Sequence, residues 1–522
     1  MTATMIVTSI LIVLFFALML WIGVSSRKHA NSVNGFVLGS RSVGPWLSAF
    51  AYGTSYFSAV IFVGYAGQFG WTFGVASTWI GIGNAFIGSL LAWVILGRRT
   101  RVMTQHLSCK TMPDFFGVRF GSKALKIAAS VITFLFLIPY TASLYNGLSR
   151  LFSMAFGGVD YAVCVIVMAV LTGIYVIIGG YMATAINDFI QGMIMVGGIV
   201  AVIAAVLKNN GGLTVAMEKL ATGENGGWEY TSFFGAQPLF LLFVVLLTSL
   251  GTWGLPQMVG KFYAIKNEDS IKKGTVISTL FAIIVAGGCY FLGGFGRLYN
   301  VDVAANGYDA IIPEMLSTLP AILIGVVIVL VLSASMSTLS SLVLTSSSTI
   351  TLDFIEPASK KKFSEKNKML VMRAFIVVFV VISAVIAIVQ ANHKSLFIAQ
   401  MMGVSWGALA GAFLAPFLFG LYYKKTTKAA VATSFVFGVT MEIVQLCISL
   451  KWFSVGSIPV LSFVFRNSLY SGVFAMVGGL ILVPIVSAFT QRTKPENVEA
   501  MFDCYHAVRT VEVTDSLGED AD

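Results

Sequence analysis

Hydroxyl side chains are concentrated in one stretch of the chain, residues 332–354. Twelve of the nineteen residues at 333–351 are Ser or Thr, and no Gly or Pro breaks the stretch. Scattered hydroxyls commonly hold membrane helices together, whereas a dense one-sided band suits oxygen coordination of a cation. The band therefore favours an ion site on one helical face. The hydroxyls that share this face, by their i, i+4, i+7, i+8 spacing, are Ser333, Ser337, Ser340 and Ser341.

Two acidic side chains stand within otherwise apolar stretches. Asp188 lies in the sequence GGYMATAINDFIQG, and Glu442 lies in VTMEIVQLC. A carboxylate inside a bilayer costs about 3 kcal/mol on insertion scales, so such residues commonly serve a transport pathway. Asp188 could instead meet water at a helix end, because Gly179 and Gly180 shortly precede it. Asp188 is therefore a candidate for ion or proton binding, and the role of Glu442 stays open.

Two further stretches combine polar residues with helix breakers. Residues 51–60, AYGTSYFSAV, place Gly53 beside Thr54, Ser55 and Ser58. Residues 248–257, TSLGTWGLPQ, hold two glycines and a proline around a tryptophan. Unwound backbone at membrane depth exposes carbonyl oxygens, which coordinate sodium in transporters. The small residues at 51–60 would equally serve as a packing notch between helices.

The composition identifies the chain as an integral membrane protein. Of its 522 residues 57% are hydrophobic and 11% are charged, against about 25% charged residues in soluble proteins. Apolar runs of about 20 residues recur without the alternation of strands, so we expect an all-α fold that crosses the bilayer many times. In a membrane protein the distribution of Lys and Arg among the loops reports orientation, so the net charge of +10 does not indicate a nucleic-acid partner, and we expect none.

The cysteines and histidines exclude several kinds of chemistry. The five cysteines are scattered without the spacing of a disulfide framework or a zinc site. The four histidines all fall in expected loops or in the tail, so an intramembrane Ser–His or Cys–His nucleophile is unsupported. The apolar stretches also lack paired acids, and we therefore do not expect an enzyme.

The apolar runs predict thirteen transmembrane helices. The first run is followed by Arg27 and Lys28, the reverse of the flank of a cleavable signal peptide. With the N-terminus outside, most of the 33 Lys and Arg fall on the inner side, so we expect a cytoplasmic C-terminus and a cell-membrane location. The expected helices are residues 6–24, 47–71, 75–97, 125–153, 160–178, 187–207, 234–259, 274–296, 318–351, 370–390, 396–421, 427–450 and 468–490.

The expected helices divide the chain into six segments. Helices two to six and seven to eleven form two groups of five, with the breaks at Gly53 and Gly254 in the first helix of each group. Breaks at corresponding positions point to the central site of a transporter. The segments are an N-terminal extra helix with a cytoplasmic loop (1–46), the first five helices (47–207), an extracellular loop (208–233), the second five helices (234–421), two C-terminal helices (422–494) and a cytoplasmic tail (495–522).

Several motifs together resemble the sodium–solute symporter family, which includes proline, pantothenate, monocarboxylate, sialic acid and glucose symporters. They are LGSRSVGPWLSAF, GGYMATAINDFIQG, SMSTLSSLVLTSSSTITLDF and SWGALAGAFLAPFLFGLYY. The similarity covers essentially the whole chain. It implies the 5+5 inverted-repeat fold of bacterial amino-acid symporters, with one extra N-terminal helix and two extra C-terminal helices. It also implies sodium as the coupling ion.

The resemblance assigns ion-binding roles to particular residues. The main sodium site would use the backbone carbonyls of Thr54, Phe57 and Ala334 and the hydroxyls of Ser337 and Thr338. Five oxygens without a carboxylate suit a weakly held monovalent ion that must also leave. Some family members bind a second sodium beside the acid of the GG…ND motif. The residues that fit this second site here are Asp188, Ser340 and Ser341, together with Ser337.

The resemblance also places a solute cavity. The proline carriers have Asp at the position of Tyr56 and aromatic residues at those of Thr248 and Thr252, and this chain departs at all three. Other features look closer to the pantothenate and monocarboxylate branches, and the cluster of Glu, Asn and Gln expected for a sugar is missing. An organic acid or an amino acid is therefore the expected solute. The residues implied to line the cavity are Tyr56, Ser58, Tyr140, Trp253, Gln257 and Trp406.

The function implied by the resemblance is sodium-coupled symport of a small organic solute into the cell by alternating access. Its partners would be the solute, sodium and the lipid bilayer, and we expect a monomer to suffice for transport. The alternatives are proton coupling through Asp188 and sodium-coupled transport of proline or of a sugar. An ion channel lacks a recognisable filter segment in this sequence, and a solute sensor would keep the fold without transport.

Overall fold

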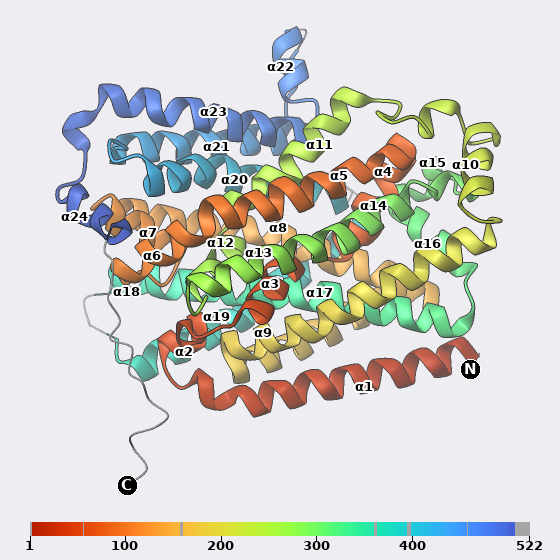
Figure 1. Ribbon diagram of the computed structural model, residues 1–522, viewed down its shortest axis with the longest axis horizontal. Coiled ribbons are helices and arrows are strands. Elements are labelled where there is room, and N and C mark those ends of the chain that lie inside the picture. The colour runs from red at the N-terminus through yellow and green to blue at the C-terminus, as the bar shows by residue number, and fades with distance from the viewer. Residues whose placement is uncertain are drawn as a thin grey trace.

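The structure is a computed structural model that describes residues 3–55, 57–156, 160–359, 363–393, 398–456 and 458–506. Within these ranges the chain is helical and forms no strand, apart from an isolated bridge between Val43 and Ile265. The long helices run side by side along one direction (Figure 1). The expected all-α membrane fold is confirmed.

Eight long helices form most of the bundle. Helix α17, which carries the hydroxyl band, packs against α1, α8, α9 and α19, and it is buried throughout residues 330–344. The eight helices are α1 (Ala3–Ser25), α8 (Lys123–Phe156), α9 (Tyr161–Asn209), α17 (Ala321–Thr349), α19 (Glu365–His393), α20 (Ile398–Tyr422), α21 (Lys428–Ser449) and α23 (Ser468–Phe489).

The other spanning segments consist of shorter helical pieces with π-helical or 3-10 turns between them. The first is α3 (Pro45–Thr54), η3 (Val60–Tyr65) and α4 (Ala66–Phe73); the next is α5 (Thr78–Gly83), η5 (Asn84–Leu91), η6 (Trp93–Gly97) and α6 (Arg98–His106). The second half contains α11 (Pro238–Leu250), η8 (Gly251–Gly254) and α12 (Pro256–Tyr263), then α13 (Glu268–Ala282), η9 (Ile283–Gly287) and α14 (Gly288–Gly293).

Short helices lie at the two ends of the bundle. Helices α10 (Leu213–Thr222) and α15 (Val303–Asn306) lie at the end where α1 begins, and α24 (Val498–Phe502) lies at the opposite end (Figure 1). The remaining short helices are α2 (Val33–Leu38), α7 (Met112–Arg119), α16 (Ile311–Ser317), α18 (Glu356–Ala358) and α22 (Pro459–Val464).

The structure divides the membrane-spanning segments differently from the thirteen predicted helices. In the described residues, ten helices are long and apolar enough to span a membrane, or eleven if α11–η8 and α12, bent by 46°, are one span. Two of the ten, Val60–His106 and α9, contain 47 and 49 residues, about 70 Å of helix each, which is enough for two crossings. The count of thirteen is not confirmed and stays a prediction.

A glycine interrupts each of these two long segments, Gly74 in the first third of Val60–His106 and Gly180 near the middle of α9. Gly74 has φ 64° and ψ −143°, and Gly180 has φ 55° and ψ −150°. Residues with a Cβ rarely adopt such a conformation, so these glycines permit a sharp change of direction. A Cβ at Gly180 would also overlap Phe36 of α2. The interruptions coincide with the boundaries predicted between residues 71 and 75 and between 178 and 187.

The start of the predicted tail is ordered, and residues 507–522 lie outside the described residues. Phe502 of α24 is 4% exposed, and Tyr505 donates a hydrogen bond to the Arg99 carbonyl. Lys424 and Glu499 form an exposed ion pair. An aromatic anchor therefore holds residues 498–505 against α6.

Candidate functional site

The candidate ion site begins with the interruption between α3 and η3. Pro45 starts α3, and the helix ends at Thr54. Gly53 lies directly before this end, where a Cβ would overlap the ring of Phe281. The backbone therefore approaches α13 closely at Gly53 and then leaves the helical path. The carbonyl groups that follow are directed towards α17.

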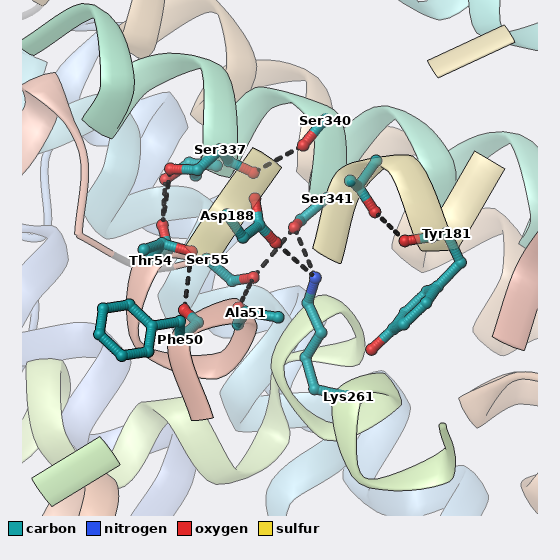
Figure 2. A network of polar contacts seen from close by, with 12 residues as sticks. Phe50, Ala51, Thr54, Ser55, Tyr181, Asp188, Lys261, Ser337, Ser340 and Ser341 are labelled. Carbon is teal, nitrogen blue, oxygen red and sulfur yellow. Dashed lines mark hydrogen bonds and ion pairs between the residues drawn. The ribbon is translucent and has the colours of Figure 1, made fainter. Parts of the chain in front are cut away.

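Two hydroxyls of α17 meet the carbonyls of this interruption. Ser337 Oγ lies 3.2 Å from the Thr54 carbonyl oxygen and 3.1 Å from that of Ala334. Thr338 Oγ1 lies 3.0 Å from the Thr54 carbonyl oxygen and 3.2 Å from that of Phe57. It also lies 3.1 Å from the Ala334 carbonyl oxygen. The structure therefore brings all five residues of the predicted main sodium site together. Figure 2 shows Ser337 beside Thr54 in this cluster.

The chemistry of this cluster favours a cation. The carbonyl oxygens of Thr54, Phe57 and Ala334, the last of which also takes part in the backbone hydrogen bonds of α17, face only two hydroxyl groups, and each hydroxyl has a single proton to donate at a time. All five residues are at most 1% exposed, so water at the surface does not supply the missing donors. A buried cluster with more acceptors than donors is stabilised by a positive ion, and neutral oxygen ligands suit a hard cation.

A second polar cluster lies one helical turn further along α17. Asp188 of α9 is fully buried, and its Oδ2 lies 3.4 Å from Nζ of Lys261 on α12. Lys261 Nζ also lies 2.9 Å from Ser341 Oγ, and Ser341 Oγ lies 2.9 Å from Ser55 Oγ (Figure 2). The hydroxyl of Ser340 instead donates to the Ser337 carbonyl at 2.9 Å. Asp188 and Ser341 are therefore together, with a lysine between them.

Lys261 is the functional candidate that sequence reasoning missed. It follows the predicted helix 234–259 and was assigned to a cytoplasmic loop, whereas the structure places it in α12 with 4% exposure. Pro256 starts this new helix, and Lys261 is four residues after Gln257, on the same helical face. This i, i+4 spacing after the Gly254-Leu255-Pro256 break was the signal available in the sequence.

Three of the predicted solute residues form one group. Tyr140 and Trp406 are fully buried and pack edge to face, with ring centroids 5.9 Å apart. Ser58 lies beside the Tyr140 hydroxyl. This group joins α8 and α20 to the first residues after the interruption of α3.

The other predicted solute residues are placed differently. Trp253 donates its indole N–H to the Ile87 carbonyl at 3.0 Å. Gln257 is buried, neither of its amide atoms has a partner in the described part of the chain, and it lines a cavity of about 50 Å³ with Lys261. Ligand pockets usually measure about 300 Å³ or more, so this cavity is too small for a solute. Tyr56 lies outside the described residues.

Glu442 is buried away from these clusters. Its Oε1 accepts a hydrogen bond from Ser471 at 2.7 Å, and a Cβ at Gly407 would overlap its carboxyl group. The side chain therefore occupies a gap that a glycine leaves between α20, α21 and α23. Packing and Ser471 therefore hold Oε1, whereas Oε2 has no hydrogen-bond partner among the described residues.

Comparison with known proteins identifies the family. The family model described as "Sodium:solute symporter family" matches residues 36–438. The chain belongs to this family. Its named relatives are transporters and not enzymes, and the chain is a multi-pass membrane protein.

The similar relatives in this family include proline transporters. The osmoregulated proline transporter OpuE of Bacillus subtilis (strain 168) is 26% identical over 492 residues, which is 92% of this chain and 94% of the relative. A sodium/proline symporter of Staphylococcus aureus (strain JH9) is 29% identical over 452 residues, 84% of this chain and 86% of the relative.

Solved structures share the fold of this family member. A substrate-bound, outward-open Na⁺-coupled sialic acid symporter superposes with a TM-score of 0.72 at 18% identity, covering 92% of this chain and 98% of that one. A nucleobase-cation-symport-1 family transporter in a closed conformation gives 0.51 at 15% identity, covering 90% and 98%. At these identities the similarity concerns the fold alone.

Proposed function

We propose that this chain is a secondary transporter that couples the entry of sodium to the uptake of a small organic solute by alternating access. The observation that carries the proposal is the convergence of three carbonyls and two hydroxyls where α3 is interrupted. Sodium would bind the carbonyls of Thr54, Phe57 and Ala334 and the hydroxyls of Ser337 and Thr338. Membership of the sodium:solute symporter family supports this coupling ion.

The solute pocket that we propose lies beside this ion site. Phe57 belongs to the sodium cluster, and the next residue, Ser58, belongs to the group with Tyr140 and Trp406. A solute bound to this group would order the same interrupted backbone that binds sodium. Each ligand would then favour the other by a coupling free energy. Gln257 and Trp253 on the second interrupted segment would complete the pocket after a conformational change.

The proposed solute is an organic acid or an amino acid. A small carboxylate-bearing compound fits a pocket with two aromatic rings, a serine hydroxyl and a glutamine amide. Pantothenate and monocarboxylates are candidates from the resemblance of the sequence. Proline is a further candidate because relatives of 26% and 29% identity are named as proline transporters.

The driving force for solute accumulation follows from the membrane potential and the sodium gradient. A membrane potential of 100 mV contributes about 2.3 kcal/mol per sodium ion. A tenfold sodium gradient contributes about 1.4 kcal/mol. One sodium ion could therefore support roughly 500-fold accumulation of a neutral solute. We propose that the N-terminus lies outside and that transport is directed into the cytoplasm by a monomer.

Uptake into proteoliposomes tests the proposal. Labelled pantothenate, pyruvate, proline and other amino acids, sialic acid and glucose would be offered with and without an inward sodium gradient. We expect sodium-driven accumulation of one class of solute by the parent protein. The double variant Ser337→Ala with Thr338→Ala should lose that accumulation.

Proton coupling is the alternative that the same assay resolves. Asp188 is paired with Lys261, so its carboxylate already has a positive partner, which argues against its use as the coupling site for a proton. Uptake that follows an imposed pH gradient, with no response to sodium or to the loss of the two hydroxyls, would contradict the sodium proposal.

A further inference from the structure

The position expected for a second sodium ion holds the side chain of Lys261. Its ammonium group lies 3.4 Å from Asp188 Oδ2 and 2.9 Å from Ser341 Oγ, two of the groups that would bind the ion. A carboxylate and a hydroxyl oxygen are hard ligands that accept either a metal cation or an ammonium group. Figure 2 shows Lys261 reaching between α9 and α17 to these two oxygens.

The local fold fixes Lys261 in this position. Helix α12 begins at Pro256, directly after the bend in the second interrupted segment, and Lys261 lies in its second turn. The lysine side chain is 5% exposed and lies 5.2 Å from the centre of the Tyr181 ring. A buried ammonium group needs a counter-charge, and Asp188 supplies it. Neither member of the pair is open to bulk solvent, so each charge depends on the other for its compensation.

The charge balance of the pair disfavours a second cation at this position. With the Asp188 carboxylate ionised and the Lys261 amine protonated, the pair is neutral. A sodium ion bound to the same oxygens would lie within a few ångströms of the ammonium group and be repelled by it. Without the lysine, Asp188 would be an unpaired buried carboxylate near the Ser341 hydroxyl, an arrangement that attracts a cation.

We propose that Lys261 is a built-in cation that replaces a second sodium ion, so that the chain binds one sodium ion per transport cycle. The inference rests on the proposed sodium-coupled function, because it assigns the remaining ion to the Thr54–Thr338 cluster. Lys261 acts as a positioning residue for this transport, since its contacts are with Asp188 and Ser341 and not with the bound ion.

A chain of contacts connects the ammonium group to the interruption of α3. Lys261 donates to Ser341, Ser341 and Ser55 share a hydrogen bond of 2.9 Å, and Ser55 donates to the Ala51 carbonyl at 2.5 Å. Ser55 directly follows Thr54, whose carbonyl is part of the sodium cluster. The ammonium group is therefore connected by hydrogen bonds to the interrupted backbone next to the proposed sodium cluster.

The same ammonium group lines the small cavity next to Gln257. This cavity continues along α17 past Thr345 to Lys110 and Thr111, at the end of the bundle where α6 meets α7. A tethered ammonium group supplies the charge without leaving, which keeps the number of transported charges at one.

The number of bound sodium ions tests the inference. Binding of ²²Na⁺ to the purified, detergent-solubilised protein would be measured to saturation by scintillation proximity, with choline replacing sodium. We expect one ion per chain for the parent and for Lys261→Arg, which keeps the charge. We expect two ions for Lys261→Met, which removes the charge and retains a long apolar side chain.

The matched double variant keeps the test decisive if the single variant folds poorly. Lys261→Met with Asp188→Asn removes both charges, and we expect it to fold and bind one ion. If Lys261→Met unfolds at low sodium, its thermal midpoint should rise with sodium more steeply than that of the double variant. One ion in a folded Lys261→Met, or two in the parent, would overturn the inference.

The outcomes also separate this inference from the proposed function. A parent that binds no sodium while Lys261→Met binds one ion would refute the proposed main site and support the role of Lys261. A parent that binds one ion, lost in Ser337→Ala with Thr338→Ala, together with one ion in Lys261→Met, would support the main site and refute the role of Lys261.

Discussion

Replacing Thr338 by valine tests the ion site most directly. Valine keeps the β-branched shape of threonine and removes only the Oγ1 hydroxyl, which contacts three carbonyl oxygens at 3.0–3.2 Å. Thr338 is fully buried, so water does not reach the oxygens that lose their partner. The variant therefore removes one of five proposed sodium ligands while it leaves the packing of α17 nearly unchanged.

The size of the effect follows from the strength of contacts with a charged group. A hydrogen bond or ion contact of this kind contributes about 1.5–3 kcal/mol. Each 1.4 kcal/mol corresponds to a tenfold change in a binding constant. We therefore expect the sodium concentration for half-maximal binding to rise about 10- to 150-fold in Thr338→Val.

Binding of ²²Na⁺ to the purified protein measures this shift without knowledge of the solute. Thr338→Ser keeps the hydroxyl and should stay within a few fold of the parent. Thr349→Val is a matched control on the same helix, because the Thr349 hydroxyl only donates to the Thr345 carbonyl of its own helix at 2.5 Å. An unchanged sodium affinity in a well-folded Thr338→Val would refute the assignment of this cluster as the ion site.

Three further predictions concern other parts of the molecule. A Cβ at Gly70 would overlap a backbone carbonyl of α14, so Gly70→Ala should lower the free energy of unfolding by about 1–3 kcal/mol and lower the thermal midpoint. Gly197→Ala is the control, because a Cβ at Gly197 would meet no atom within 4 Å, and its thermal midpoint should match the parent. Glu442→Gln keeps an acceptor for Ser471, so sodium binding and thermal midpoint should match the parent; a lost sodium response would contradict a structural role. Burial raises the pKa of the Cys504 thiol, so less thiolate is present at pH 7.5 than in the unfolded chain. Maleimide labelling of Cys504, followed by mass spectrometry, should therefore be slower in the folded protein, and the difference should shrink as the pH rises. Equal labelling rates at pH 7.5 would contradict the docking of the tail.

Part of the candidate ion site could be predicted from the sequence because helical spacing is a local property. The positions of Ser337 and Ser341 on one face of α17 follow from 3.6 residues per turn, and in the structure both hydroxyls contact the end of α3. The partners of these hydroxyls on α3 came from the resemblance to a family. Spacing within one helix contains no information on which other helix it meets.

The role of Lys261 was not predictable because it depends on tertiary contacts. A lysine two residues beyond an apolar run normally marks the start of a cytoplasmic loop. Here a new helix, α12, begins at Pro256 directly after the bend, and Lys261 is buried within the bundle. The compensating carboxylate, Asp188, is 73 residues away in the chain. Neither the direction of α12 nor this pairing is contained in the hydropathy pattern.

The helix boundaries show the same limit. The break at Gly180 was expected as a loop between two helices, whereas the structure makes the turn with a single glycine of positive φ inside α9. Only the backbone conformation changes there, and the side chains on both sides stay buried or apolar. A hydropathy profile detects a gap in apolar residues and does not distinguish a short loop from a glycine bend.

The proposed coupling follows from the position of α17 between the two interrupted segments. Its Ser337 and Thr338 contact the carbonyls after α3, and its Ser341, one turn further on, contacts Lys261 after the second interruption. A continuous helix transmits a displacement at one turn to the next, because its hydrogen-bonded backbone is stiff over that distance. Sodium bound at the first turn would hold α3 against α17, and movement of α12 would shift Ser341 and with it Ser55, which adjoins the sodium ligands. Since linkage is reciprocal, a solute that repositions α12 would change sodium affinity by the same factor by which sodium changes solute affinity.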